Sequence, residues 1–425
     1  MFAHAYLILA VIAIAFTVSR LFKLTTELSM LVAAIAGAAV HTRGFPIRHI
    51  VEGAFTYYDV CLIFISATFF MNLVKEAGGA AFIVRSIVIR FNKQRFVCLL
   101  LLSLVMLIPG ALTGAGAVSV LILGTMVGTV LKYMGISENR TVAIIFLCAA
   151  MSAAAPPVNL WAMMAAAGSN MPYVGFFQPL LLITVIGSLI SMFSLGWQGK
   201  TVNLEKALEE LPKPPDKMNW FRVVTPFAVF FILVAAGRIW PFSMPILGLP
   251  LMFLLSAFTA ILLSPKKLPI VNIATNTIRQ LIPLVGIMIV VGILIQIMAL
   301  SGARGLISLK VVTLPLVVLF ATLWLILPIS EGLVQYAVAP LLGVPLILLF
   351  NMKGLNPIIA LSGMAVMWPL GDHLPPTAVV GRATVIELKF SGRYYRDFLK
   401  STLIPELIIL ALATGYIIFS KKLSF

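Results

Sequence analysis

Residues 109–157 read PGALTGAGAVSVLILGTMVGTVLKYMGISENRTVAIIFLCAAMSAAAPP, and residues 328–376 read PISEGLVQYAVAPLLGVPLILLFNMKGLNPIIALSGMAVMWPLGDHLPP. An offset of 219 residues superimposes five pairs of helix-breaking residues: Pro109 on Pro328, Gly124 on Gly343, Gly135 on Gly354, Pro156 on Pro375 and Pro157 on Pro376. Glycine and proline turn or interrupt helices, whereas few other residues match. The pattern therefore predicts a repeat of backbone geometry rather than of side chains.

The first part of each repeat is predicted to be a re-entrant hairpin. In residues 96–131, two apolar runs that are short for full membrane spans are separated by the uncharged tip Thr113-Gly114-Ala115-Gly116. Because a loop in water is normally polar, this tip predicts a bend that stays at membrane depth. The second hairpin is predicted at residues 311–350, with its tip at Ile329-Ser330-Glu331-Gly332.

The second part of each repeat is predicted to be a broken helix. Residues 141–169 are interrupted at Pro156-Pro157, and residues 356–386 at Pro375-Pro376. Proline lacks a backbone donor and clashes with the preceding turn, so both helices should break within the membrane. Such backbone is tolerated only where it lines a cavity or is buried in protein.

The composition also indicates a membrane protein. Of 425 residues, 61% are hydrophobic and 10% are charged, against about 45–50% apolar and about 25% charged in ordinary globular chains. About ten or eleven stretches approach the roughly 20 apolar residues of a helical span. These figures exclude a soluble enzyme, a nucleic-acid binder and a disulfide-stapled secreted domain. The net charge of +16 is interpreted as basic loops that face anionic lipid.

The chain is predicted to divide into two halves around a linker. Residues 1–197 form the first half and residues 220–425 the second. Between them, residues 198–219 are the only sustained polar segment, with mixed charges and three prolines, which suits an exposed linker.

Paired interrupted helices at corresponding positions of two halves point to the binding site of a secondary transporter. The alternative for each break alone is a structural kink satisfied by its neighbours. We expect an all-α polytopic membrane protein built from two inverted repeats, each with one hairpin and one broken helix. No metal-ligand spacing and no nucleophile–base motif indicates an enzyme, so neither a cofactor nor a transition metal is expected, only a coupling ion.

The ion-binding candidates form two half-sites, and the coupling ion is predicted to be Na⁺ or H⁺. They are Thr113, Gly114, Gly116, Pro156 and Asn159 in the first half, and Ser330, Glu331, Gly332, Asp372, Pro375 and Thr377 in the second. Glu331 and Asp372 are the strongest, because an acid within the membrane is costly. The alternative is that residues 371–373 already lie at the aqueous surface.

Four residues are candidate substrate contacts: Ser119, Ser152, His373 and Arg382. Arg382 could bind a carboxylate bidentately, or instead pair with Glu387. A serine in a membrane helix often only bonds its own helix backbone. In a second hypothesis, Glu331, Asp372 and His373 form a proton relay.

Two segments carry a resemblance to a known family. Residues 110–179, with AAPPVNLWAMMAAAG, and residues 326–384, with PISEGLVQYAVAPLLGVP and WPLGDHLPPTAVVGRAT, resemble the large membrane subunit of tripartite ATP-independent periplasmic (TRAP) transporters. The resemblance implies an inner-membrane, multi-pass protein that couples Na⁺ entry to uptake of a small organic anion such as a dicarboxylate. It implies an elevator mechanism, a small four-helix membrane subunit and a periplasmic substrate-binding protein as partners. The alternative is a stand-alone H⁺-coupled transporter or antiporter of the same superfamily.

Overall fold

The computed structural model describes residues 2–41, 44–240, 242–243, 245 and 247–423. All regular secondary structure among these residues is helical. Nine helices of the described residues are long and apolar enough to cross a membrane, which confirms an all-helical membrane protein. Four further apolar helices have fewer than 18 residues. The sequence predicts ten or eleven spans because hydropathy counts some of these shorter helices as crossings.

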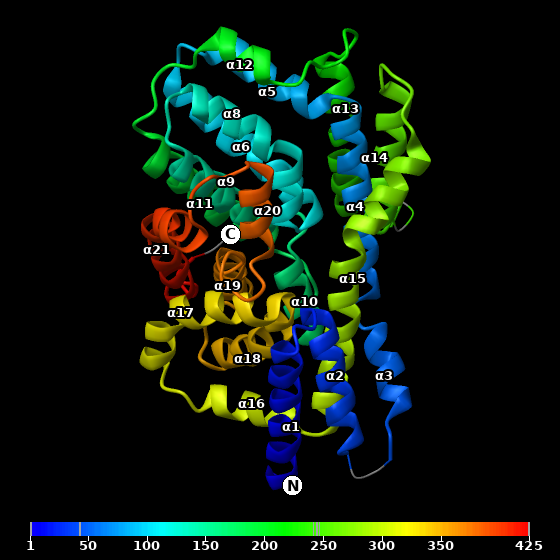
Figure 1. The fold of residues 1–425 in the computed structure, drawn as a ribbon. Helices are drawn as coiled ribbons and strands as arrows, with labels where there is room; N and C mark the ends of the chain where they lie inside the picture. Colours follow the sequence, from blue (N-terminus) through cyan, green and yellow to red (C-terminus); the bar gives the residue numbers. More distant parts are fainter. Residues whose placement is uncertain (1, 42–43, 241, 244, 246, 424–425) are drawn as a thin grey trace.

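One group of helices, here called the outer group, comes from the start of each half of the chain. It comprises α1 (Phe2–Leu21), α2 (Thr26–Ala39), α3 (Ile47–Ala54), α4 (Tyr58–Glu76), α13 (Trp220–Ile239), α14 (Leu249–Leu263) and α15 (Ile270–Leu300). The long helix α15 organises this group because it packs against α2, α3 and α4. In Figure 1 the outer group occupies the right side and the lower end of the molecule.

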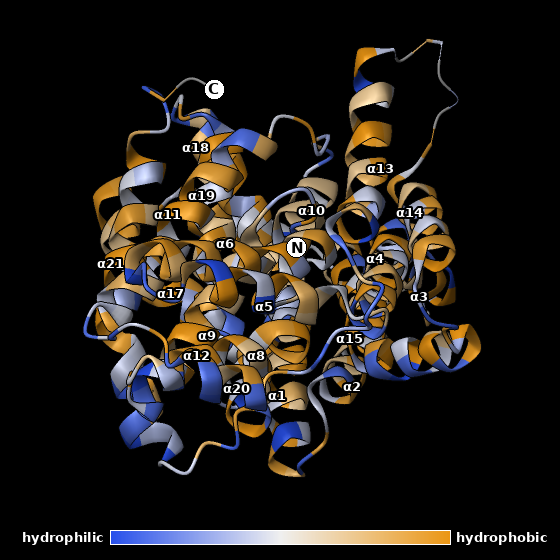
Figure 2. Cartoon of the chain, turned by 90° about the horizontal axis from the view of Figure 1, so that it is seen from above, coloured by the Kyte–Doolittle hydropathy of each residue, from blue (hydrophilic) through white to orange (hydrophobic). Residues whose placement is uncertain are grey.

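Most of the remaining helices, long and short, form a second cluster, here called the core group. Its first part is α6 (Arg95–Thr113), α7 (Gly116–Ser119), η1 (Val120–Gly124), α8 (Thr125–Tyr133), α9 (Glu138–Ala154), α10 (Leu160–Gly168) and α11 (Phe177–Gly196). Its second part is α17 (Leu316–Val334), η2 (Gln335–Ala337), η3 (Ala339–Gly343), α18 (Val344–Met352), α19 (Pro357–Leu370), α20 (Val379–Glu387), η4 (Tyr394–Phe398) and α21 (Leu399–Ile418). Helices α5 (Gly79–Phe91) and α16 (Ala303–Val312) connect the two groups. Figure 2 shows that most helices of both groups consist largely of hydrophobic residues, as a bilayer requires.

The elements of the core group recur at the offset found in the sequence. The π-helical turns η1 and η3, the helices α8 and α18, and the helices α10 and α20 each begin and end 219 residues apart. Figure 1 shows α6 and α8 in the upper half of the molecule and α17 and α18 in the lower half. The repeated glycines and prolines thus coincide with repeated helix ends.

The two hairpins, here called hairpin 1 (95–133) and hairpin 2 (316–352), turn at equivalent places. In hairpin 1, α6 ends at Thr113 and Gly114 adopts a φ of 71°, which a glycine accepts without strain. In hairpin 2, α17 continues to Val334 and the chain turns at Gln335, whose φ is 52°. The predicted tip at Ile329–Gly332 is therefore wrong by about one helical turn. The helix continues through Pro328 because membrane helices tolerate proline when neighbours satisfy the backbone.

The two interruptions are here called break 1, residues 155–159, and break 2, residues 371–378. They separate α9 from α10 and α19 from α20, and each contains a cis peptide bond, at Pro156-Pro157 and at Pro375-Pro376. Backbone bonds tie each break to its own hairpin: the Val158 N–H donates to the Ala111 carbonyl at 3.0 Å, and the Thr377 N–H donates to the Gly332 carbonyl at 3.2 Å.

A hairpin arm and a broken helix cross closely in each repeat, and the two crossings use glycine on opposite partners. In the first, a Cβ at Gly110 of hairpin 1 would collide with Ser152 of α9. In the second, a Cβ at Gly371, the equivalent of Ser152, would collide with the backbone of Pro328 in hairpin 2. Each crossing is therefore close enough to require a glycine on one of its two segments.

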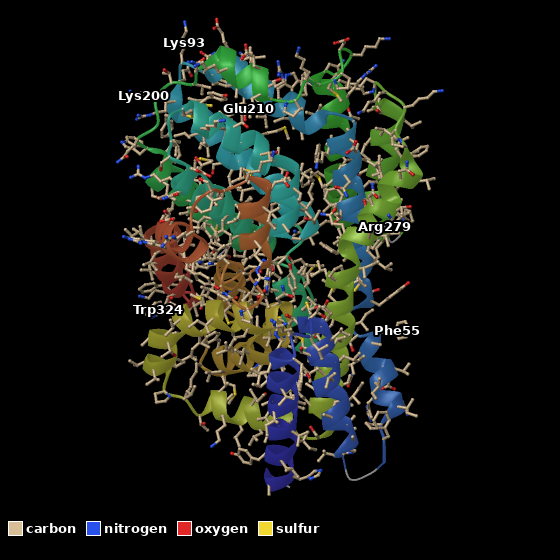
Figure 3. All side chains as sticks on the ribbon, in the orientation of Figure 1. Phe55, Lys93, Lys200, Glu210, Arg279 and Trp324 are labelled. Carbon is tan, nitrogen blue, oxygen red and sulfur yellow. The ribbon has the colours of Figure 1, made fainter. Side chains whose placement is uncertain are left out.

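The polar linker lies along the end of the molecule where α5 and hairpin 1 terminate. Its short helix α12 (Leu204–Glu210) is near the top of Figure 1, and Figure 3 places Lys93, Lys200 and Glu210 at the same end. The Lys200 N–H donates to the Met134 carbonyl at 2.7 Å, and Arg85 Nη1 of α5 donates to the carbonyls of Leu208 and Leu211, each at 2.9 Å. The linker is thus bonded to both α5 and hairpin 1.

Candidate functional site

Two carboxyl groups are buried where hairpin 2 meets break 2. Glu331, in the last turn of α17, has no exposed surface, and Asp372 is 2% exposed. The two carboxyl groups are close enough for their charges to repel. One oxygen of each, Glu331 Oε1 and Asp372 Oδ1, has no hydrogen-bond partner. Because burying an uncompensated charge is costly, this carboxyl pair is a candidate site for a cation or a proton.

The other Glu331 oxygen is bonded across the repeats. Trp161 Nε1, on α10 of the first repeat, donates to Glu331 Oε2 at 2.8 Å. The indole also packs on the ring of Tyr336, just after the tip of hairpin 2, with centroids 4.7 Å apart. The helix that follows break 1 therefore positions the acid of hairpin 2, so the site is formed from both repeats.

Asp372 is held at the start of the helix that follows break 2. The backbone N–H groups of Val379 and Val380, in the first turn of α20, interact electrostatically with its carboxyl group. A helix N-terminus carries free N–H groups and a positive dipole end, so it stabilises a carboxylate. Thr377 Oγ1 donates to the Gly332 carbonyl at 2.9 Å, which fixes the break against hairpin 2.

His373 faces away from the carboxyl pair. Its Nε2 lies 3.2 Å from Glu406 Oε2 of α21, and its Nδ1 lies 2.7 Å from the Leu370 carbonyl. The ring also packs on Phe146 of α9, with centroids 4.5 Å apart. These contacts anchor break 2 to α9 and α21, and they separate His373 from the substrate contacts predicted for it.

The candidates in the first repeat are neutral and make local bonds. Thr113 Oγ1 donates to the Pro109 carbonyl at 2.8 Å, and Ser119 Oγ and Ser152 Oγ lie 2.7 Å apart. Asn159 caps α10 by accepting from the Ala162 N–H at 2.9 Å, and it donates to the Ala154 carbonyl at 2.7 Å. All four polar side chains are completely buried, so they stabilise break 1 and its crossing with hairpin 1.

A cavity of about 500 Å³, here called the central cavity, lies between the outer group and the core group. From the outer group it is lined by Arg20, Lys23, Thr25, Thr26, Glu27, Phe64, Gln280 and Leu284, among others. From the core group it is lined by Ala115, Ala117, Val118 and Leu121 of hairpin 1, and by Gln335, Tyr336, Pro376, Thr377, Val380 and Arg382 of the second repeat. Both hairpin tips therefore reach the same cavity.

The charges around the central cavity favour an anion. Three basic side chains, Arg20, Lys23 and Arg382, line it together with one acid, Glu27. Arg382 Nη2 donates to the Pro376 carbonyl at 3.1 Å, which holds the side chain beside break 2. Glu331 and Asp372 do not themselves line this cavity, but Gln335, Tyr336 and Thr377, which are four or five residues from them in the sequence, belong to its wall.

The structure brings together only some of the residues predicted from sequence. Thr377 and Arg382 line the central cavity, and Glu331 and Asp372 are close in sequence to residues that line it; Pro156 instead lines an apolar groove on the other side of hairpin 1. Ser330 donates to the Leu327 carbonyl at 2.8 Å and faces a separate apolar pocket. Gly114, Gly116, Gly332 and Pro375 shape the tips and breaks. Among the described residues, no cluster of three or more acidic, histidine or cysteine side chains could hold a metal ion.

Several functional candidates were not predicted from the sequence: Trp161, Gln335, Tyr336, Glu406, Arg20 and Lys23. Gln335 could have been found, because the 219-residue offset maps the tip 113–116 onto 332–335, and Tyr336 is the next residue. Trp161 and Glu406 carry no local signal, since their partners lie 170 and 33 residues away.

The fold resembles those of solved membrane transporters, although no protein-family model and no curated relative match the sequence. MtrF of Neisseria gonorrhoeae, from a class of antimetabolite efflux pumps, is 13% identical, with 92% of this chain and 94% of that chain covered and a TM-score of 0.62. The YdaH transporter of Alcanivorax borkumensis is 13% identical, with 92% and 98% covered and a TM-score of 0.64. This chain therefore is a multi-pass membrane protein with the fold of these transporters.

Proposed function

We propose that this protein is a secondary transporter that carries a small organic anion through the central cavity together with a cation bound by Glu331 and Asp372. The observation that carries the proposal is the buried carboxyl pair, close in sequence to the wall of a cavity with three basic side chains. An anion and a cation bound side by side partly neutralise each other, which lowers the cost of moving either through the membrane. This arrangement favours symport.

The proton is the better-supported coupling ion. Both acids come from the second repeat, whereas the neutral oxygens expected to complete a Na⁺ site in the first repeat make local bonds at 2.7–2.9 Å. A shared proton needs only the two carboxyl groups, because it removes one of two repelling charges. Trp161 would then hold one acid in place while the other gains or loses the proton.

Sodium is a second candidate, favoured by a different observation. Gln335 Oε1, four residues after Glu331, is also buried without a partner. Three such oxygens at one hairpin tip and one helix break are the type of ligand that a hard cation prefers.

The proposed cargo is a small dicarboxylate, and the proposed mechanism is an elevator. Two carboxylates match the excess of basic side chains, two on the outer group and one on α20. The two groups meet at the central cavity, so sliding the core group past the outer group would expose the site on either side of the membrane. We also propose that the protein lies in the inner membrane, as its sequence resemblance to the TRAP family implies.

Transport into proteoliposomes tests this function. With labelled succinate as the probe, an inward H⁺ gradient without Na⁺ should drive uptake, and Glu331→Gln should strongly reduce it. Uptake that requires a Na⁺ gradient at equal pH would select the second candidate. If a panel of mono- and dicarboxylates gave no uptake under either gradient, the proposal would be wrong.

A further inference from the structure

An apolar groove of about 840 Å³ lies on the side of the molecule and is here called the lateral groove. One wall comes from α6 and α11 of the core group, and the other from α5 and α13. Its lining is almost entirely hydrophobic and includes Leu104, Leu181, Val224 and Phe231, which are 37–49% exposed. The groove therefore opens toward the hydrocarbon of the bilayer.

The groove connects the charged end of the molecule with the interior of the membrane. At one end it is lined by Arg90 in the last turn of α5 and by Trp220, the first residue of α13. At the other end it reaches Pro156 and Pro157 of break 1. Tryptophan and arginine at one end and hydrocarbon side chains along the rest match the profile of a lipid from head group to tail.

Arg90 is available to a ligand. Its guanidinium makes no hydrogen bond or ion pair with any described residue, whereas the neighbouring Arg85 donates to two linker carbonyls. Lys93 lies at the same end of the molecule (Figure 3). An unpaired arginine at the rim of an apolar groove complements a negatively charged head group, because guanidinium binds phosphate oxygens bidentately.

We propose that the lateral groove binds one anionic phospholipid, with its phosphate on Arg90 and its acyl chains along α6, α11 and α13 as far as break 1. The lipid fills the space between the core group and the outer group. If the core group slides, as the proposed function requires, this lipid must move or leave, so its occupancy sets the rate of transport. Lipid binding itself does not depend on the proposed function.

Native mass spectrometry of the full chain tests the binding directly. The purified protein is mixed with equal amounts of phosphatidylglycerol and phosphatidylcholine with identical acyl chains. We expect one retained lipid, with phosphatidylglycerol preferred by about fivefold, which corresponds to one basic residue at the membrane surface. Arg90→Ala should remove the preference, whereas Arg279→Ala, an exposed arginine that does not line the groove (Figure 3), should keep it.

Two variants that narrow the groove test whether it also binds the acyl chains, independently of the head group. Val224→Phe and Leu181→Phe enlarge exposed side chains on opposite walls, so they should fold normally and lower retention of both lipids. Equal retention of the two lipids by the unmodified protein, a preference that survives Arg90→Ala, or a protein adduct in place of a lipid would overturn the proposal. Loss of transport in Glu331→Gln with unchanged lipid binding would support both proposals independently.

Discussion

Break 1 and break 2 share one backbone plan but differ in chemistry. Both follow an apolar helix, contain Pro-Pro and lead into a nine-residue helix, α10 or α20. At break 1 the polar groups are neutral and each is bonded locally, through Asn159, Ser152 and Ser119. At break 2 the buried groups are Asp372 and His373, and Asp372 leaves one oxygen unpartnered.

This difference suggests that break 1 serves stability and break 2 serves ion coupling, although the two breaks have the same backbone plan. Local bonds between neutral groups hold break 1 and hairpin 1 together, and Trp161 of α10 donates to the acid of hairpin 2. In the proposed function, break 2 and hairpin 2 hold the groups that change charge or bind ions. Substitutions at break 1 should therefore lower stability, whereas substitutions at break 2 should lower coupling.

The largest effect on stability is expected at Gly371, which packs directly against the backbone of hairpin 2. Gly371→Ala would place a Cβ against the Pro328 backbone, which cannot move aside, and should destabilise the protein by about 3 kcal/mol. Gly110→Ala meets mainly Ser152 and should cost about 2 kcal/mol. Thermal unfolding in detergent measures both, with Gly286→Ala, which meets no atom within 4 Å, as the control. Equal melting temperatures for Gly371→Ala and Gly286→Ala would contradict the crossing.

Glu331→Gln should reduce ion-driven transport by about 100-fold, because the amide keeps the shape but removes the buried charge. The control is Glu209→Gln in the linker helix α12, which should transport normally. Thermal unfolding should show that Glu331→Gln is folded. Normal coupled transport by this variant would remove the distinction between the two breaks.

Trp161→Phe tests the link between the breaks. It keeps an aromatic ring against Tyr336 but removes the donor to Glu331 Oε2, so the affinity for the coupling ion should change by about tenfold. The ion-concentration dependence of uptake measures this change, and Trp324→Phe, which bonds only the Ala321 carbonyl of its own helix, is the matched control. A similar effect of both substitutions would show that the hydrogen bond is not the cause.

Asn159→Ala should lower the stability of break 1 without changing ion coupling. It removes the cap of α10 and the bond to the Ala154 carbonyl, and should cost about 1 kcal/mol of stability. The ratio of transport to folded protein should stay unchanged, whereas the melting temperature falls. A changed ion dependence with normal stability would place Asn159 in the ion site instead.

The smallest expected effect concerns the end of hairpin 1 to which the linker is bonded. Hydrogen bonds from Tyr133 and Lys132 hold the pKa of the Glu210 carboxyl below its usual 4.5. A lowered pKa in the folded state means that this contact stabilises the docked linker above pH 4.5 and is lost as the pH falls through the lowered value. A spin label at Lys206→Cys should become more mobile from pH 7 to pH 4, and Glu210→Gln should remove that pH dependence.

The sequence predicts the membrane class, the repeat offset and the positions of the breaks, because glycine, proline and long apolar runs act locally. It places the second tip at Ile329–Gly332, since Pro328 resembles a helix end, although α17 continues to Val334. Trp161 and Glu406 could not be predicted, because their roles depend on partners brought close only by tertiary packing. Thr377, within break 2, and Arg382, just after it, can be predicted as cavity candidates because they are close in sequence to Pro375-Pro376.

The opposite placement of glycine at the two helix crossings has a consequence for comparing the halves of the chain. Each crossing needs one glycine, but either segment can supply it: Gly110 of hairpin 1 lies against Ser152 in the first crossing, and Gly371 of break 2 lies against Pro328 in the second. Identity scoring penalises both positions, although the two crossings are equally close. A comparison that asks whether either segment carries the glycine would detect such repeats after residue identity has been lost.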